Sequence, residues 1–110
     1  MTDADNYAMR LRGRPCAYCG APAVNGDHVI PRSVVRSYNR SAPTGAPSIP
    51  SEWLTVVAAC FACNIRKGPR RLVPPSWAAR VNELNHFFGG TPFRVWHGDP
   101  SEPAFAAVHL

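Results

Sequence analysis

Four cysteines constrain this chain more than any other feature of its sequence. They form two Cys-x-x-Cys pairs, Cys16/Cys19 and Cys60/Cys63, with forty residues between the pairs. Two residues between paired cysteines let both sulfur atoms face one tetrahedral ion, and two such pairs complete a closed four-thiolate zinc site. Two other uses of such cysteines fit less well. Disulfides need an oxidising compartment, and the chain shows no secretory signal. A thioredoxin-like redox motif needs one such pair at a helix start in a βαβ unit, not two matched pairs. We therefore predict a structural Zn²⁺ ion with no open position for chemistry.

A zinc ion would also offset the small size of the chain. With 110 residues, one domain with a modest core is expected. Zinc binding of ~10–16 kcal/mol, as in zinc-finger peptides, rivals the whole stability of such a domain.

The longest apolar run, residues 56–63, is far shorter than the ~20 residues that span a bilayer, and the first ten residues lack the apolar core of a secretory signal. We expect a cytoplasmic protein with no membrane partner.

The basic residues are concentrated in one segment. The chain carries a net charge of +5, but residues 10–71 alone carry nine Arg and Lys67 against two acidic residues, a net +8. Eleven of the twelve basic residues are Arg, whose planar guanidinium matches phosphate oxygens better than an ammonium does. This segment suits a polyanion, and an Arg-rich soluble surface without such a partner is the alternative.

Composition divides the chain into three regions. Residues 1–13 are interpreted as a polar N-terminal tail, residues 14–90 as one α+β domain, and residues 91–110 as a C-terminal extension whose hydrophobic residues show no clear periodicity. Pro and Gly within residues 14–23 favour an irregular knuckle around the first cysteine pair, and residues 41–51 read as an exposed loop.

Five regular elements are expected within the domain. A turn at Asn25-Gly26 predicts a pair of short strands in residues 24–30, and the β-branched residues of 54–59 predict a further strand. Residues 61–67 predict a short helix. A C-terminal helix is expected after Ser76, with a core-packing stripe at helical spacing formed by Trp77, Val81, Leu84 and Phe88.

Oxygen and imidazole donors lie beside the cysteine frame. Asp27 and His28 lie between the two cysteine pairs, and Asn64 directly follows Cys63. A carboxylate and an amide carbonyl are hard oxygen ligands that suit Mg²⁺ or Mn²⁺, and a neutral imidazole beside such an ion can take a proton from water. A lone His on a short apolar strand is more often structural, so the catalytic interpretation depends on the neighbouring ligands.

Three motifs occur in order along half of the chain, from Cys16 to Gly68. They are CxxCG, then DHxxPRS, then a hydrophobic strand leading into CxxCNxxKG, in the strings CAYCGAPAVNGDHVIPRS and WLTVVAACFACNIRKG. Together they resemble the HNH endonuclease family, in its zinc-ribbon type found in phage and bacterial genomes. The resemblance implies a ββα-metal (His-Me finger) fold, in which two antiparallel strands and a helix grip one catalytic divalent ion while the cysteines hold a separate zinc.

The resemblance also implies roles for individual residues. His28 matches the general base that activates water, Asp27 matches the first metal ligand, and Asn64 matches the second metal ligand at the helix start. The implied products carry a 5′-phosphate and a 3′-hydroxyl. Thr55 departs from the family, which has at this position a middle Asn that fixes the loop carrying the His. Thr supplies one hydroxyl bond but not the two-ended bridge of an amide.

The same region supplies the predicted phosphate contacts. These are the basic residues close to the motifs: Arg14, Arg32, Arg66, Lys67, Arg70 and Arg71. For Arg66 and Lys67 the alternative is a solvated last helical turn, which the helix dipole favours. Trp53 is expected to pack in the core rather than to stack on a base.

These observations predict a metal-dependent endonuclease acting on double-stranded DNA. A zinc-ribbon module that binds DNA without cutting it is the first alternative, motivated by Thr55 and the excess of Arg. The second alternative is an accessory nuclease that is active only within a phage packaging or restriction complex.

Overall fold

Two short strands that are distant in sequence form the centre of the fold. In the computed structural model, which describes residues 10–99, β1 (Asn25–His28) pairs antiparallel with β2 (Val56–Ala59). The predicted hairpin within residues 24–30 is therefore wrong, because its turn residues Asn25 and Gly26 lie inside β1. A hairpin with this turn would have only Val24 in its first arm and gains little stability by itself, whereas β2 offers β1 a partly buried partner strand.

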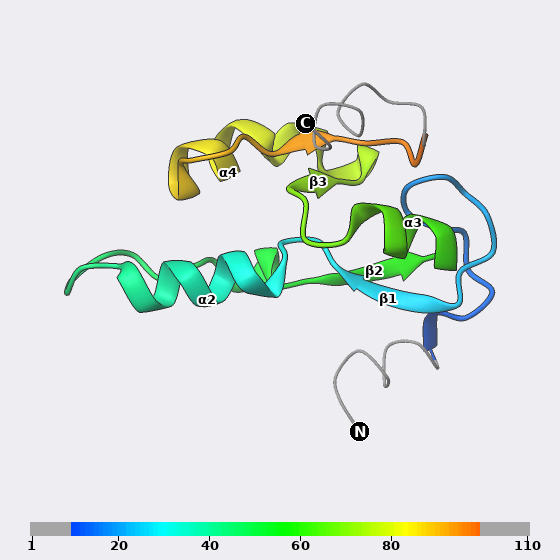
Figure 1. Ribbon diagram of the computed structural model, residues 1–110, viewed down its shortest axis with the longest axis horizontal. Coiled ribbons are helices and arrows are strands. Elements are labelled where there is room, and N and C mark those ends of the chain that lie inside the picture. The colour runs from blue at the N-terminus through cyan, green and yellow to red at the C-terminus, as the bar shows by residue number, and fades with distance from the viewer. Residues whose placement is uncertain (1–9, 100–110) are drawn as a thin grey trace.

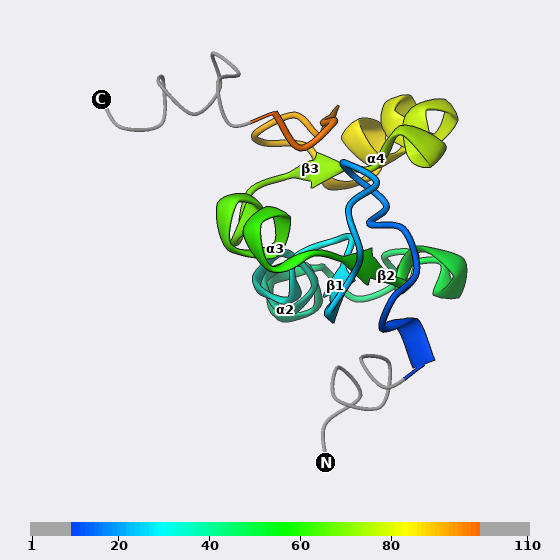
Figure 2. The same cartoon turned by 90° about the vertical axis from the view of Figure 1, so that its right-hand side faces the viewer.

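The helix α3 (Phe61–Lys67) follows β2 directly and packs on β1. It has the bounds predicted from the sequence. At its start the Cys60 Sγ accepts a hydrogen bond from the backbone N–H of Cys63, and at its end Gly68 adopts a positive φ of 49°. In both views of the molecule α3 lies between the β1–β2 pair and β3 (Figures 1 and 2).

A helix that the sequence did not predict follows β1. This is α2 (Arg32–Ser41), which begins after Pro31. Its apolar side chains Val34, Val35 and Tyr38 pack against the larger hydrophobic core. The Tyr38 ring lies 4.8 Å from the ring of Phe87, centroid to centroid, so aromatic packing joins α2 to the C-terminal part of the fold.

The predicted C-terminal helix forms in two parts. Residues Pro75–Arg80 are a 3₁₀-helix, η2, and α4 (Val81–Phe88) continues from it. The predicted core-facing stripe is confirmed, since Trp77 and Leu84 are buried and its other two members pack against the same core.

Residues 91–99 belong to the packed structure. The short strand β4 (Arg94–Val95) pairs in parallel with β3 (Leu72–Val73), and Phe93 and Trp96 are buried. The packed region thus extends past the predicted domain boundary at residue 90, because the aromatic residues beyond that boundary fill the core.

A second aromatic residue expected in the core is also found there. Trp53, in the 3₁₀-helix η1 (Ser51–Trp53), is buried and meets the ring of Phe87 edge to face. No helix within residues 10–99 is long and apolar enough to cross a membrane. The molecule described is a small mixed fold of short helices and two two-stranded sheets.

Candidate functional site

The fold gathers all four cysteines into one cluster. Their sulfur atoms lie within 4.8 Å of one another, although the two pairs come from separate parts of the chain. The Sγ atoms of Cys19 and Cys60 are 3.7 Å apart. Two sulfurs at ~2.3 Å from one tetrahedral zinc ion are about 3.8 Å apart, so this spacing fits the ion. The four cysteines could therefore hold a structural zinc.

The thiols of the cluster differ in acidity. Burial opposes ionisation of Cys16, but hydrogen bonds with the backbone at Cys19 and Cys60 outweigh it and lower its pKa to about 7. Burial raises the pKa of Cys63, and neighbouring thiols add to the rise. Since zinc binds thiolates, Cys16 is close to its binding form at neutral pH, whereas Cys63 has to release a proton when a metal binds.

Gly98 closes this cluster from the C-terminal side, and sequence reasoning missed it. It is buried, with φ at 79°, and a Cβ atom there would lie 2.8 Å from Cys19 Cβ and 2.9 Å from Cys63 Sγ. The nearby Trp96 ring packs on Tyr18, with 5.6 Å between ring centroids. Only a fold that returns residues 96–98 to the cysteines could reveal this role.

Asp27 is the centre of a buried polar network. The Tyr18 hydroxyl donates to Asp27 Oδ2 at 2.6 Å, and Lys67 Nζ lies 3.2 Å from the same oxygen. Lys67 also donates to the carbonyl oxygen of His28 at 3.1 Å. Burial raises the pKa of Tyr18, which keeps its hydroxyl a donor. One network thus joins the first cysteine knuckle, β1 and the end of α3.

The predicted role of Lys67 as a phosphate contact is corrected by this arrangement. Its side chain is completely buried. Burial lowers its pKa, against the attraction of the Asp27 carboxylate. A lysine at the end of a short helix looks solvated in sequence, but α3 turns this position toward β1, where the carboxylate of Asp27 needs a partner.

Three of the four residues predicted for the catalytic site line one surface hollow, and the fourth, Thr55, does not. Asp27, His28 and Asn64 border a space of about 320 Å³, which we name the Asn64 hollow. Strand β1 supplies the first two residues and α3 supplies the third. Arg32 and Arg36 of α2 form another part of its wall. A site with two oxygen donors, an imidazole and cationic side chains is therefore assembled at the junction of three elements.

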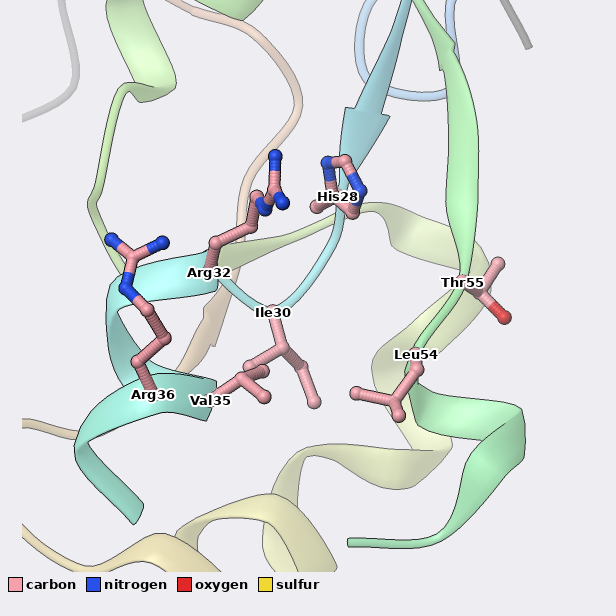
Figure 3. Close-up of a pocket in the computed structure, with 7 residues that line it drawn as sticks. All are labelled: His28, Ile30, Arg32, Val35, Arg36, Leu54 and Thr55. Carbon is pink, nitrogen blue, oxygen red and sulfur yellow. The ribbon is translucent and has the colours of Figure 1, made fainter. Parts of the chain in front are cut away.

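His28 also borders a second hollow, of about 330 Å³, shared with Thr55 and named here the Thr55 hollow (Figure 3). The Thr55 side chain points away from the imidazole, and its hydroxyl donates to the Glu52 carbonyl at 2.9 Å. The backbone carbonyl of Thr55 instead accepts from the N–H of Val29 at 3.1 Å. The contact from this position to the segment after His28 is thus made by the backbone.

The remaining predicted phosphate contacts fall into two groups. Arg14, Arg32 and Arg66 are exposed. Arg70 and Arg71 are half-buried, and their guanidinium groups donate to backbone carbonyls. The Arg71 guanidinium bonds the carbonyls of Gly89 and Thr91 and lies over the Phe93 ring, so its first role is to hold the loop after α4.

Comparisons with protein-family models, with curated proteins and with solved structures each gave no match. The functional interpretation of this chain therefore rests on its own residues and their geometry.

Proposed function

We propose that this protein is a metal-dependent DNA endonuclease of the HNH zinc-ribbon type, in which β1, β2 and α3 act as a ββα-metal motif. One observation carries the proposal. Asp27, His28 and Asn64, which match the family's general base and metal ligands, line the same hollow although they come from two distant segments. The antiparallel pairing of β1 with β2 and the packing of α3 on β1 support it.

Each of the three residues has a distinct task in this proposal. The His28 imidazole takes a proton from the attacking water. A carboxylate has about four lone-pair sites, so Asp27 keeps acceptor capacity beyond its bonds to Tyr18 and Lys67. That capacity and the Asn64 carbonyl oxygen would hold Mg²⁺ or Mn²⁺. Such an ion would stabilise the negative charge that develops on the phosphodiester during cleavage.

The cysteine cluster has a structural task in the same proposal. A Zn²⁺ ion bound by four thiolates fixes the end of β2 and the start of α3, because Cys60 and Cys63 lie at that junction. Asn64 follows Cys63, so the zinc site also sets the position of the amide. Zinc would thus act on catalysis through the positions of Asn64 and of Asp27, since Tyr18 of the first cysteine knuckle bonds the Asp27 carboxylate.

A specific observation favours a second candidate, a zinc-dependent module that binds DNA without cutting it. The Asp27 carboxylate is 7% exposed and already forms an ion pair with Lys67. A cation at that position repels a divalent ion. If Asp27 is purely structural, the exposed arginines would bind DNA while the hollow holds no catalytic ion.

A plasmid assay separates the two candidates. Supercoiled DNA is incubated with the zinc-loaded protein and Mg²⁺ or Mn²⁺, and nicked and linear products are measured. The endonuclease predicts cleavage by the wild type and loss of cleavage in His28→Ala at unchanged zinc content. His86→Ala is the matched control, because His86 is an exposed histidine of α4 outside both hollows. Binding without any metal-dependent cleavage, or full activity of His28→Ala, would refute the endonuclease.

A further inference from the structure

Helix α2 presents a line of arginines that the sequence did not lead us to group. Arg32, Arg36 and Arg40 are spaced four residues apart, and all three are exposed. At 1.5 Å per residue, neighbouring members are separated by about 6 Å along the helix axis. The opposite side of the helix holds the apolar residues that pack on the core. The three arginines therefore form one solvent-facing row, which we name the α2 ridge.

The α2 ridge begins at the candidate site and leads away from it. Arg32 and Arg36 line both the Asn64 hollow and the Thr55 hollow, and His28 lies at the wall that the two hollows share. Figure 3 shows both arginine side chains extending from α2 on the side where the imidazole lies. Arg40 lies beyond the hollows, toward the end of α2 that is remote from β1 (Figure 1).

This concentration of charge has a cost within the protein itself. Like charges four residues apart on a helix repel, and Arg32 in the first turn opposes the helix dipole, whereas the dipole favours Arg40 in the last turn. Helix α2 contains no acidic residue. Within residues 10–99 none of the three guanidinium groups forms an ion pair or a hydrogen bond. No side chain in the part of the chain that the structure describes therefore pairs with these charges, and an anionic partner would relieve the repulsion between them.

We propose that the α2 ridge is a track for the phosphates of one DNA strand, which places a phosphate of that strand beside His28. Regularly spaced guanidinium groups suit a polymer with regularly spaced negative charges, and each suits two oxygens of one phosphate. An acidic protein surface would not require such a row to start at a hollow that holds an imidazole. The proposal rests on the endonuclease function, and it adds Arg36 and Arg40 to the substrate-binding residues.

Binding measurements test the track separately from cleavage. The anisotropy of a labelled DNA duplex is titrated with zinc-loaded His28→Ala protein at several salt concentrations, alone and combined with Arg36→Gln or Arg40→Gln. Each phosphate contact contributes about 0.9 to the slope of log affinity against log salt, so each substitution should reduce the slope by about 1. Arg80→Gln is the matched control, since Arg80 stacks over Trp77 and lines neither hollow.

A second measurement is plasmid cleavage by Arg36→Gln and Arg40→Gln, each introduced alone into the wild-type protein, which keeps His28. Arg40→Gln should raise KM with kcat unchanged, because Arg40 lies outside both hollows. Slopes unchanged by Arg36→Gln and Arg40→Gln, or reduced equally by Arg80→Gln, would overturn the track. If only the ridge substitutions reduce the salt slope, and the wild type shows no plasmid cleavage, the track is upheld and the endonuclease is refuted. If the ridge substitutions leave binding to the DNA duplex unchanged but weaken binding to an acidic polypeptide, the track is overturned and the ridge is assigned to a protein partner.

Discussion

Replacing Lys67 with Met should destabilise the protein by about 3–5 kcal/mol. The ammonium of Lys67 lies 3.2 Å from Asp27 Oδ2, and the side chains of Lys67 and Asp27 are 1% and 8% exposed. Water therefore screens this pair little. Removal of one partner of a buried ion pair leaves the other charge uncompensated, which costs roughly 3–5 kcal/mol. That is a large fraction of the roughly 5–15 kcal/mol that holds a domain of this size together.

The assay is urea unfolding of the zinc-loaded protein, followed by tryptophan fluorescence. Arg66→Met is the matched control, because Arg66 precedes Lys67 on α3, carries the same charge and is exposed. Its unfolding free energy should change by no more than about 0.5 kcal/mol. The double variant Asp27→Asn/Lys67→Met should recover stability relative to Lys67→Met, because it buries no unpaired charge and the new amide oxygen still accepts from Tyr18.

The double-mutant cycle decides whether the ion pair is the cause. We expect a coupling between Asp27 and Lys67 of about 2 kcal/mol or more, beyond the ~0.5 kcal/mol within which independent sites add. A loss in Lys67→Met no larger than that in Arg66→Met, or additive effects of the two substitutions, would refute the buried pair.

The remaining predictions concern zinc, the cluster, Thr55 and pH. Removal of zinc by a chelator should abolish the near-ultraviolet circular dichroism of the fold, because zinc binding of ~10–16 kcal/mol rivals the whole stability; an unchanged spectrum would contradict a structural zinc. Gly98→Ala should lower zinc affinity and stability, since its Cβ would meet Cys19 and Cys63 below 3 Å at a positive φ, whereas Gly45→Ala, also at positive φ but with nothing within 4 Å, controls for backbone strain; equal zinc affinity in the two variants would contradict the close contact. Thr55→Val should lose about 1 kcal/mol with its bond to Glu52 and keep the cleavage rate, because its side chain points away from His28; a large fall in the rate at full zinc content would show that the hydroxyl acts on the site. The stability difference between wild type and Lys67→Met should grow as pH rises toward 10.5, because the folded protein releases the Lys67 proton before the unfolded chain does, and a difference that shrinks would contradict the lowered pKa.

Local spacing accounts for what could be predicted of the site. Two residues between paired cysteines let both sulfurs of a pair face one ion, and the fold then brings the two pairs into one cluster. The end of α3 follows from Gly68, a helix stop signal that adopts a positive φ in the structure. Asp27, His28 and Asn64 were singled out by their donor chemistry, and they line one hollow because they adjoin the elements that the cysteines bring together.

Contacts between distant segments account for what could not be predicted. The sequence favoured a turn at Asn25-Gly26, but long-range pairing made those residues part of a strand. Helix α2 contains Ser, Asn and β-branched residues with weak helix propensity, and packing of its apolar side on the core stabilises it. The arginine row of α2 could not be predicted, because residues four apart share one side only in a helix and no helix was predicted there.

By itself, the sequence determined the cysteines of the cluster, the basic character of the chain and the residue types available near His28, because these depend on residue type and on spacing over a few positions. Only the tertiary structure decided which charges face solvent and which are buried. It placed the ammonium of Lys67 inside against Asp27 and brought Gly98 against the cysteines. Burial depends on which surfaces meet, and surfaces from residues forty or eighty positions apart meet only when the whole chain folds.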